Sequence, residues 1–148
     1  MKKEISIFKR VAWAYAAGFI FVVIIGHIPS LTDQSGKLFG FYNVSTLIDA
    51  VHFLAGILGV VAAWHSTKWA INYLKFISIP FGLDVLISLF FSRDLLETFS
   101  IFYQGIGKPD FSLHNLLANS PHIFLSALAI FVGFYLSKKL NVDSKTSD

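Results

Sequence analysis

Two histidines in the sequence stand in closely similar local patterns. Asp49 lies three residues before His52, and Asn119 lies three residues before His122. Small residues follow each His at the fourth, seventh and eleventh positions: Gly56, Gly59 and Ala63 in the first copy, and Ser126, Ala129 and Gly133 in the second. These offsets place the residues of each copy on one face of an α-helix. Because small residues let helices approach closely in lipid, we expect both faces, and both His, to point into a helical bundle.

The imidazole and polar groups of this repeat suit several kinds of site. Two His on neighbouring helices could share a divalent metal or ligate haem, and Asp49 or Asn119 could orient a ring through its second nitrogen. Asp and Asn are also common helix N-caps, and Pro121 suits a first helical turn, so packing alone also explains these residues. The alternatives stay open: we expect no cofactor, and haem or a divalent metal on His52 and His122 is the other possibility.

Two further ionisable residues are candidates for binding a ligand or a proton. Asp84 lies well inside an apolar run, so we expect it near the middle of a membrane, where ionisable residues are costly and usually functional. Pro80 precedes it by one turn and should kink the helix. Asp84 is therefore either a proton or ion site or a hydrogen-bonded acid that ties two helices together. His27 ends the first apolar run, on the side of the membrane where the polar residues of the repeat are expected.

Four apolar runs must position these residues, at roughly 8–28, 44–64, 70–92 and 119–137. Each approaches the roughly 20 residues that a spanning helix needs, and helices satisfy their own backbone hydrogen bonds in lipid. Hydrophobic residues make up 55% of the chain and charged residues only 14%, whereas soluble domains carry roughly 25% charged residues. We therefore predict an all-α integral membrane protein, with one transmembrane domain over 1–148. It is a four-helix transmembrane bundle built from two similar hairpins, related as a parallel pseudo-repeat.

The segments outside these runs give the orientation. Nine of the twelve Lys and Arg residues lie in the N-terminal tail, the link between the second and third runs, and the C-terminal tail. The positive-inside rule then places both termini in the cytoplasm, which we expect to be that of a bacterial cell with this multi-pass protein in its inner membrane. Residues 94–103 could form a short interfacial helix or an ordinary loop, and 140–148 should be a flexible tail.

Both histidine segments resemble a known family. Residues 49–59 and 119–125 are similar to segments of small bacterial four-helix transmembrane proteins that share a domain of unknown function. In that family a polar residue and a His stand near the start of the second and fourth helices, followed by a Gly-rich apolar stretch. Here Ser126 and Ala129 replace glycine in the second copy. The resemblance implies the four-helix fold and brings no established activity.

No catalytic motif is present: phosphate-binding loops, nucleophile elbows and H-E-x-x-H are absent, and the chain contains no Cys. We therefore expect a small non-enzymatic inner-membrane protein with a polar pocket on its outer side. Its partners should be the lipid bilayer and either a second copy or another membrane protein, with no nucleic acid. The alternative is a transporter or binding protein for protons, a metal ion or haem that uses Asp84 with His52 and His122. A membrane enzyme is a third possibility.

Overall fold

The computed structural model describes residues 6–96, 105 and 107–140. Within them lie four helices long and apolar enough to cross a membrane. The first three are α1 (Ile7–Gly26), α2 (Thr46–His65) and α3 (Thr67–Phe91). The fourth is continuous over α5 (Leu113–Ile130), a π-helical segment η3 (Phe131–Leu136) and α6 (Ser137–Lys139). The predicted all-α bundle of four apolar helices is confirmed.

The link between α1 and α2 contains the remaining described elements. A 3-10 turn, η1 (Pro29–Leu31), is followed by the strands β1 (Lys37–Leu38) and β2 (Tyr42–Asn43). The two strands pair antiparallel, with Leu38 opposite Tyr42. The predicted interfacial helix over 94–103 and the predicted flexible tail over 140–148 fall largely on residues 97–104 and 141–148, which lie outside the described part of the chain.

A serine begins each of the four long helices. Its hydroxyl accepts a hydrogen bond from the backbone N–H three residues later and so satisfies one of the free donors at a helix start. The four caps are Ser6, Ser45, Ser66 and Ser112.

The Ser112 cap changes the expected start of the fourth helix. Because Ser112 satisfies the Asn115 N–H, the helix begins at Leu113, six residues before the predicted boundary at 119. Asn119 and Pro121 therefore lie inside the helix, and the expectation that they form its cap and first turn is wrong. Proline cannot donate to the carbonyl one turn earlier, and the hydroxyl of Ser120 donates to that Leu117 carbonyl at 2.8 Å instead.

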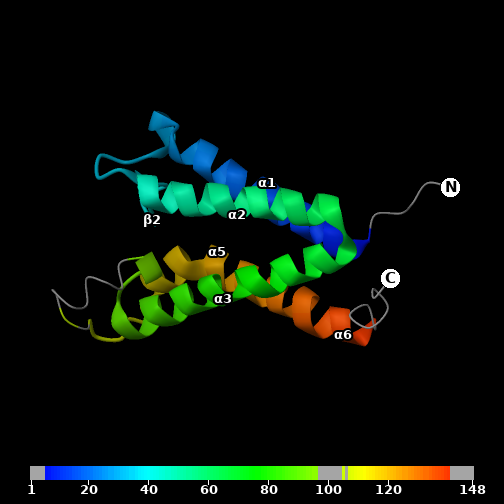
Figure 1. The fold of residues 1–148 in the computed structure, drawn as a ribbon. Coiled ribbons are helices and arrows are strands. Elements are labelled where there is room, and N and C mark those ends of the chain that lie inside the picture. Colours follow the sequence, from blue (N-terminus) through cyan, green and yellow to red (C-terminus); the bar gives the residue numbers. More distant parts are fainter. Residues whose placement is uncertain (1–5, 97–104, 106, 141–148) are drawn as a thin grey trace.

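The helices are arranged as two hairpins (Figure 1). Helix α1 packs along α2, and α3 packs along α5, while α3 also contacts α1 and α2. The short turn at Ser66 joins the hairpins, and in Figure 1 the start of α1 and the helix α6 lie at the same end of the bundle as this turn. The links between α1 and α2 and between α3 and α5 lie at the opposite end.

The small residues of both His segments are buried between helices. All six that follow His52 and His122 at the predicted offsets are buried. A Cβ on Gly59 would lie 2.9 Å from the Tyr73 hydroxyl and 3.1 Å from the Ala16 Cβ, and one on Gly133 would lie 3.0 Å from the Lys75 backbone nitrogen. The prediction that both small-residue faces contact other helices is confirmed.

The outward faces of the bundle are covered by large apolar side chains. Exposed fractions reach 77% for Trp64 and 66% for Phe124, and comparable side chains are exposed on every long helix, including Phe21, Leu54 and Phe76. Soluble proteins rarely expose apolar patches of this extent. The buried core is correspondingly thin, with Ile71 and Leu74 as its largest fully buried apolar residues.

Candidate functional site

A close contact between two ionisable side chains joins α3 to α5. Asp84 Oδ2 lies 2.7 Å from His122 Nδ1, and Asp84 Oδ1 accepts a 2.7 Å hydrogen bond from the Leu95 backbone N–H. Both side chains are largely shielded, with 15% of Asp84 and 30% of His122 exposed. Both oxygens of Asp84 are therefore engaged, and one ring nitrogen of His122 is held by the carboxylate.

This contact decides how Asp84 is held. The sequence places Asp84 near the middle of the membrane, apart from the outer polar residues, either as a proton or ion site or as a hydrogen-bonded acid that ties two helices together. Its contact with His122 has the second arrangement and joins α3 to α5. Helix α3 ends at Phe91, and Ser92 takes a left-handed conformation with φ of 50°. The chain then folds back, so the Leu95 N–H reaches Asp84. The carboxylate thus belongs to the polar cluster at the loop end of the bundle.

His52 completes this cluster from the other hairpin. Its ring centroid lies 6.1 Å from that of His122, so the predicted approach of the two His is confirmed. Phe81 packs against both rings, at 6.1 Å from His52 and 4.8 Å from His122, and stacks at 5.1 Å on Phe19. The rings of Phe19 and Phe81 thus give the His pair apolar surroundings and fill the space next to the two imidazoles. A haem between the two imidazoles would need the place that Phe81 occupies, so the site does not fit haem.

The polar residues that precede each His have other partners. Asp49 Oδ2 lies 3.6 Å from His27 Nε2, at the ends of α1 and α2 that meet near the loop. Asn119 Nδ2 donates to Ser88 Oγ at 2.8 Å and to the Asn115 carbonyl at 2.9 Å. Of the alternatives for these two residues, orientation of a His ring by Asn119 is not what the structure has, because Asp84 holds His122 and Asn119 bonds Ser88 and Asn115. Asp49 contacts His27, which is outside the His pair.

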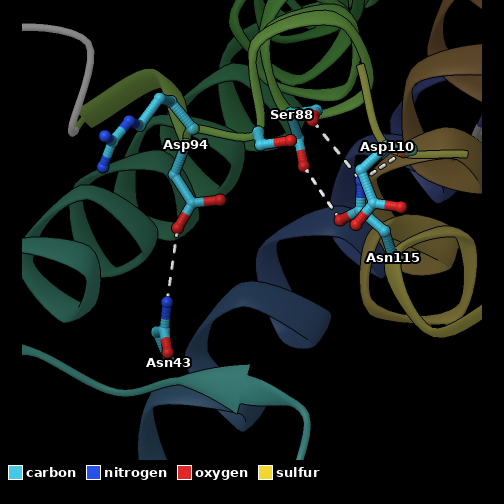
Figure 2. A pocket seen from close by; sticks show the side chains of 7 residues that line it. Asn43, Ser88, Asp94, Asp110 and Asn115 are labelled. Carbon is cyan, nitrogen blue, oxygen red and sulfur yellow. Dashed lines mark hydrogen bonds between the residues drawn. The ribbon is translucent and has the colours of Figure 1, made fainter. Parts of the chain in front are cut away.

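A polar pocket of about 240 Å³ opens beside this cluster (Figure 2). Its seven lining residues are all polar or charged: Asn43, Ser88, Ser92, Arg93, Asp94, Asp110 and Asn115. Figure 2 shows Asn43 facing Asp94 across the pocket, and their side chains lie 3.4 Å apart. The pocket therefore lies where the α1–α2 link meets the α3–α5 link.

The pocket walls are held by hydrogen bonds. Asn115 Nδ2 donates to the Asp110 carbonyl at 2.8 Å, and Ser88 Oγ donates to Asn115 Oδ1 at 3.2 Å. Ser92 Oγ donates to the Lys108 carbonyl at 2.5 Å. The backbone N–H of Ser112 binds the Asp110 carboxylate and lowers its pKa. Asp110 is therefore ionised at neutral pH.

A line of polar side chains leads from the pocket into the interface between α3 and α5. On α5 the spacing of its members is four, three and four residues, which is one helical face. The α5 members are Asn115, Asn119, His122 and Ser126, and their α3 partners are Ser88, Asp84 and Ser78. The line ends near the middle of α3, at the bond from the Ser126 hydroxyl to the Ser78 carbonyl. Sequence analysis expected a polar pocket but named none of its lining residues, although this periodic polar face pointed to its α5 wall.

No family model, curated protein or solved structure matches the chain. The resemblance noted from the two His segments therefore rests on those residues alone. Of the predicted site residues, the structure brings Asp84, His52 and His122 together, links Asn119 to the pocket wall, and pairs Asp49 with His27.

Proposed function

We propose that this chain is a small integral membrane protein that crosses the bilayer four times and binds a small polar ligand in its pocket from the outer side, without catalysing a reaction. One observation carries the proposal: a pocket lined wholly by polar and charged residues, at one end of a bundle whose sides are apolar. Polar groups gathered at one end of four apolar helices suit a site at a membrane surface.

The apolar sides support the membrane location. Each long helix is long and apolar enough to span a bilayer, and large apolar side chains cover its outward face. In water that surface would drive aggregation, whereas in lipid it matches the solvent.

The charge distribution supports the orientation. Described basic residues gather at the end that holds the start of α1, the turn at Ser66 and α6, namely Lys9, Arg10, Lys68, Lys138 and Lys139. Lys9 also donates to the Trp64 carbonyl at 3.2 Å there, and exposed Trp64 and Trp69 suit the lipid–water boundary. The positive-inside rule makes this the cytoplasmic end, so the pocket faces outward in a bacterial inner membrane.

The lining residues favour an amino-acid-sized ligand with both charged and hydrogen-bonding groups. Asp94 and Asp110 supply negative charge, Arg93 supplies positive charge, and the amides of Asn43 and Asn115 both donate and accept. The volume is below that of pockets for drug-sized molecules, roughly 300–1,000 Å³. The hydroxyls of Ser88 and Ser92 donate to Asn115 and to the Lys108 carbonyl, and neither is paired with a base that would activate it.

A ligand screen on the purified protein tests the proposal. In detergent, free amino acids and small zwitterions should raise the unfolding temperature of the wild type, and Asn115→Ala should reduce that rise. Asp33→Asn is the matched control, because Asp33 lies in the exposed turn of the same end and outside the pocket. If no zwitterion stabilises the wild type, or if Asn115→Ala responds like the control, the pocket is not the binding site.

The proposed repeat has a structural counterpart in two tyrosines. The Tyr15 hydroxyl of α1 donates to the carbonyl of Leu125, three residues after His122. The Tyr73 hydroxyl of α3 donates to the carbonyl of Ala55, three residues after His52, at 3.1 Å. The first helix of each hairpin thus reaches the equivalent carbonyl of the other hairpin, as a pseudo-two-fold axis along the bundle requires.

A second candidate function is proton binding at the Asp84–His122 pair. Its 2.7 Å contact and the polar line to the pocket favour proton exchange with the outer side. In the wild type, but not in Asp84→Asn, a carboxyl vibration should appear on acidification as Asp84 gains a proton. A spectrum unchanged by the substitution would reject this candidate.

A further inference from the structure

His52 and His122 share one arrangement, in which a neighbour engages each ring on one side. His122 Nδ1 contacts the Asp84 carboxylate, so its Nε2 is left for another partner. Phe19 packs on the His52 ring, with 5.8 Å between the ring centroids. When Nδ1 of a neutral imidazole donates a hydrogen bond to a carboxylate, Nε2 keeps its lone pair, which is the form that binds metals.

The distance between the two rings suits one shared ion. Bonds from zinc to imidazole nitrogen are about 2.0–2.1 Å, so two imidazoles on one ion have ring centres roughly 5–6.5 Å apart. The observed separation of the centroids is 6.1 Å, with 42° between the ring planes. The two rings are tilted rather than stacked, and their separation lies within the range for two ligands of one ion.

The Asp84 carboxylate has the position of a group that orients a metal ligand. Metal-binding His residues usually donate their second N–H to a carboxylate, which is itself held by hydrogen bonds. Here Asp84 contacts His122 with one oxygen, and its other oxygen is fixed by the Leu95 N–H. Phe19 and Phe81 pack on the rings and restrict their rotation.

We propose that His52 and His122 bind one divalent transition-metal ion between the two hairpins, with Asp84 as a positioning residue. Imidazole ligands suit zinc, copper and nickel, and zinc tolerates open positions that water fills. Among the described residues no three His, Cys, Asp or Glu side chains gather into a metal cluster, so the chain supplies two ligands and water supplies the rest. None of these three residues lines the pocket, so the proposal goes beyond ligand binding there.

Titration of the full chain with the metal alone tests this. The detergent-purified protein, stripped with a chelator, should bind one Zn²⁺ per chain by calorimetry. His52→Gln and His122→Gln should each abolish that binding, and Asp84→Asn should weaken it by about 10–100-fold. His65→Gln is the matched control, because His65 stacks on Trp69 in the other half of the bundle, at 4.8 Å. Asn115→Ala should leave zinc binding unchanged, which separates this site from the pocket.

A measurement on the unmodified protein covers the case in which a variant fails to fold. X-ray absorption of the zinc-loaded wild type should show scattering from two imidazoles, and the Co²⁺ form should show visible absorption bands. No binding in the wild type, an absorption spectrum without imidazole, or full binding by folded His122→Gln would each overturn the proposal. Loss of zinc binding in His65→Gln alone would place the ion at the Ser66 end of the bundle and would also overturn the proposal.

Discussion

The carboxylates of this chain differ mainly in how many neighbours hold them. Asp84 is shielded, with one oxygen on His122 and one on the Leu95 N–H. Asp49 is about as shielded, at 17% exposed, but its His27 partner is 66% exposed and lies 3.6 Å away. A charge-assisted contact between shielded groups contributes more than an exposed ion pair, since water competes with the latter. The two pairs should therefore differ in their contribution to stability.

A pair of isosteric substitutions measures that difference. Asp84→Asn removes the charge that faces His122 and should destabilise the protein by about 1–3 kcal/mol. Asp49→Asn, its control, should cost about 0–1 kcal/mol, because its His27 partner is exposed to water and lies 3.6 Å away. Unfolding in mixed detergent gives both values, and equal losses would show that the Asp84 contact contributes no more than a surface pair.

Asp33 should titrate below the usual range for an aspartate. The Lys37 N–H, together with the Ser35 hydroxyl and N–H, donates to its carboxylate and lowers its pKa. Because the pKa in the folded state lies below the unfolded value, this stabilisation of the turn is present above about pH 4. It is lost as pH falls through the lowered pKa. NMR of the Asp33 side-chain carbon checks this, and a midpoint at or above about pH 4 contradicts it.

The sequence predicted some of these residue contacts and missed others for a physical reason. Helical spacing sets which face a residue occupies, so it correctly brought His52 and His122 together. The contacts of Asp84 depend on two other features. The contact with His122 depends on how far α5 is shifted along α3, and the bond from the Leu95 N–H depends on the reversal of the chain at Ser92. Helical periodicity encodes neither, and so Asp84 was placed apart from the cluster.

At the scale of elements, serine caps and glycine contacts define the helices and their separation. Four Ser residues start the long helices, and glycines bring pairs of them close together. Hydrophobicity predicted the number of long helices correctly, because each apolar run extends over about 20 residues. The apolar pattern placed the start of the fourth helix too late. Residues 113–118 belong to this helix, but the polar residues His114 and Asn115 interrupt their apolar run. The N-cap preference of Ser112 was the available signal.

Two glycine substitutions should have opposite effects. Gly59→Ala puts a Cβ 2.9 Å from the Tyr73 hydroxyl, which donates to the Ala55 carbonyl, so overpacking should cost about 1–3 kcal/mol. Gly18→Ala meets nothing within 4 Å on α1 and should stabilise by about 0.5–1 kcal/mol, because alanine favours the helix. Thermal unfolding of both variants checks the signs, and a loss at Gly18 equal to that at Gly59 would refute the close-contact explanation.

On the scale of the whole molecule, the two ends of the bundle carry different chemistry. One end holds the turn at Ser66, exposed Trp residues and most of the described Lys and Arg. The other holds the links between helices, the pocket and the Asp84–His122 contact. The polar line between α3 and α5 starts at the pocket and ends near the middle of α3, at Ser78. This arrangement suits binding at one membrane face better than passage through the bundle.

The proposed orientation of these two ends in a membrane can be measured directly, because the chain contains no Cys. A single Cys introduced at Ser35 would lie in the exposed turn beside Asp33, and one introduced at Ser144 would lie in the C-terminal tail. We expect an impermeant thiol reagent to label the Ser35→Cys variant in intact bacterial cells. The Ser144→Cys variant should be labelled only after the membrane is permeabilised, since nine of twelve basic residues favour a cytoplasmic location for that side. Labelling of both variants in permeabilised cells is the control for accessibility. Labelling of Ser144→Cys alone in intact cells would invert the topology, put the pocket in the cytoplasm and direct the search for its ligand to cytoplasmic solutes.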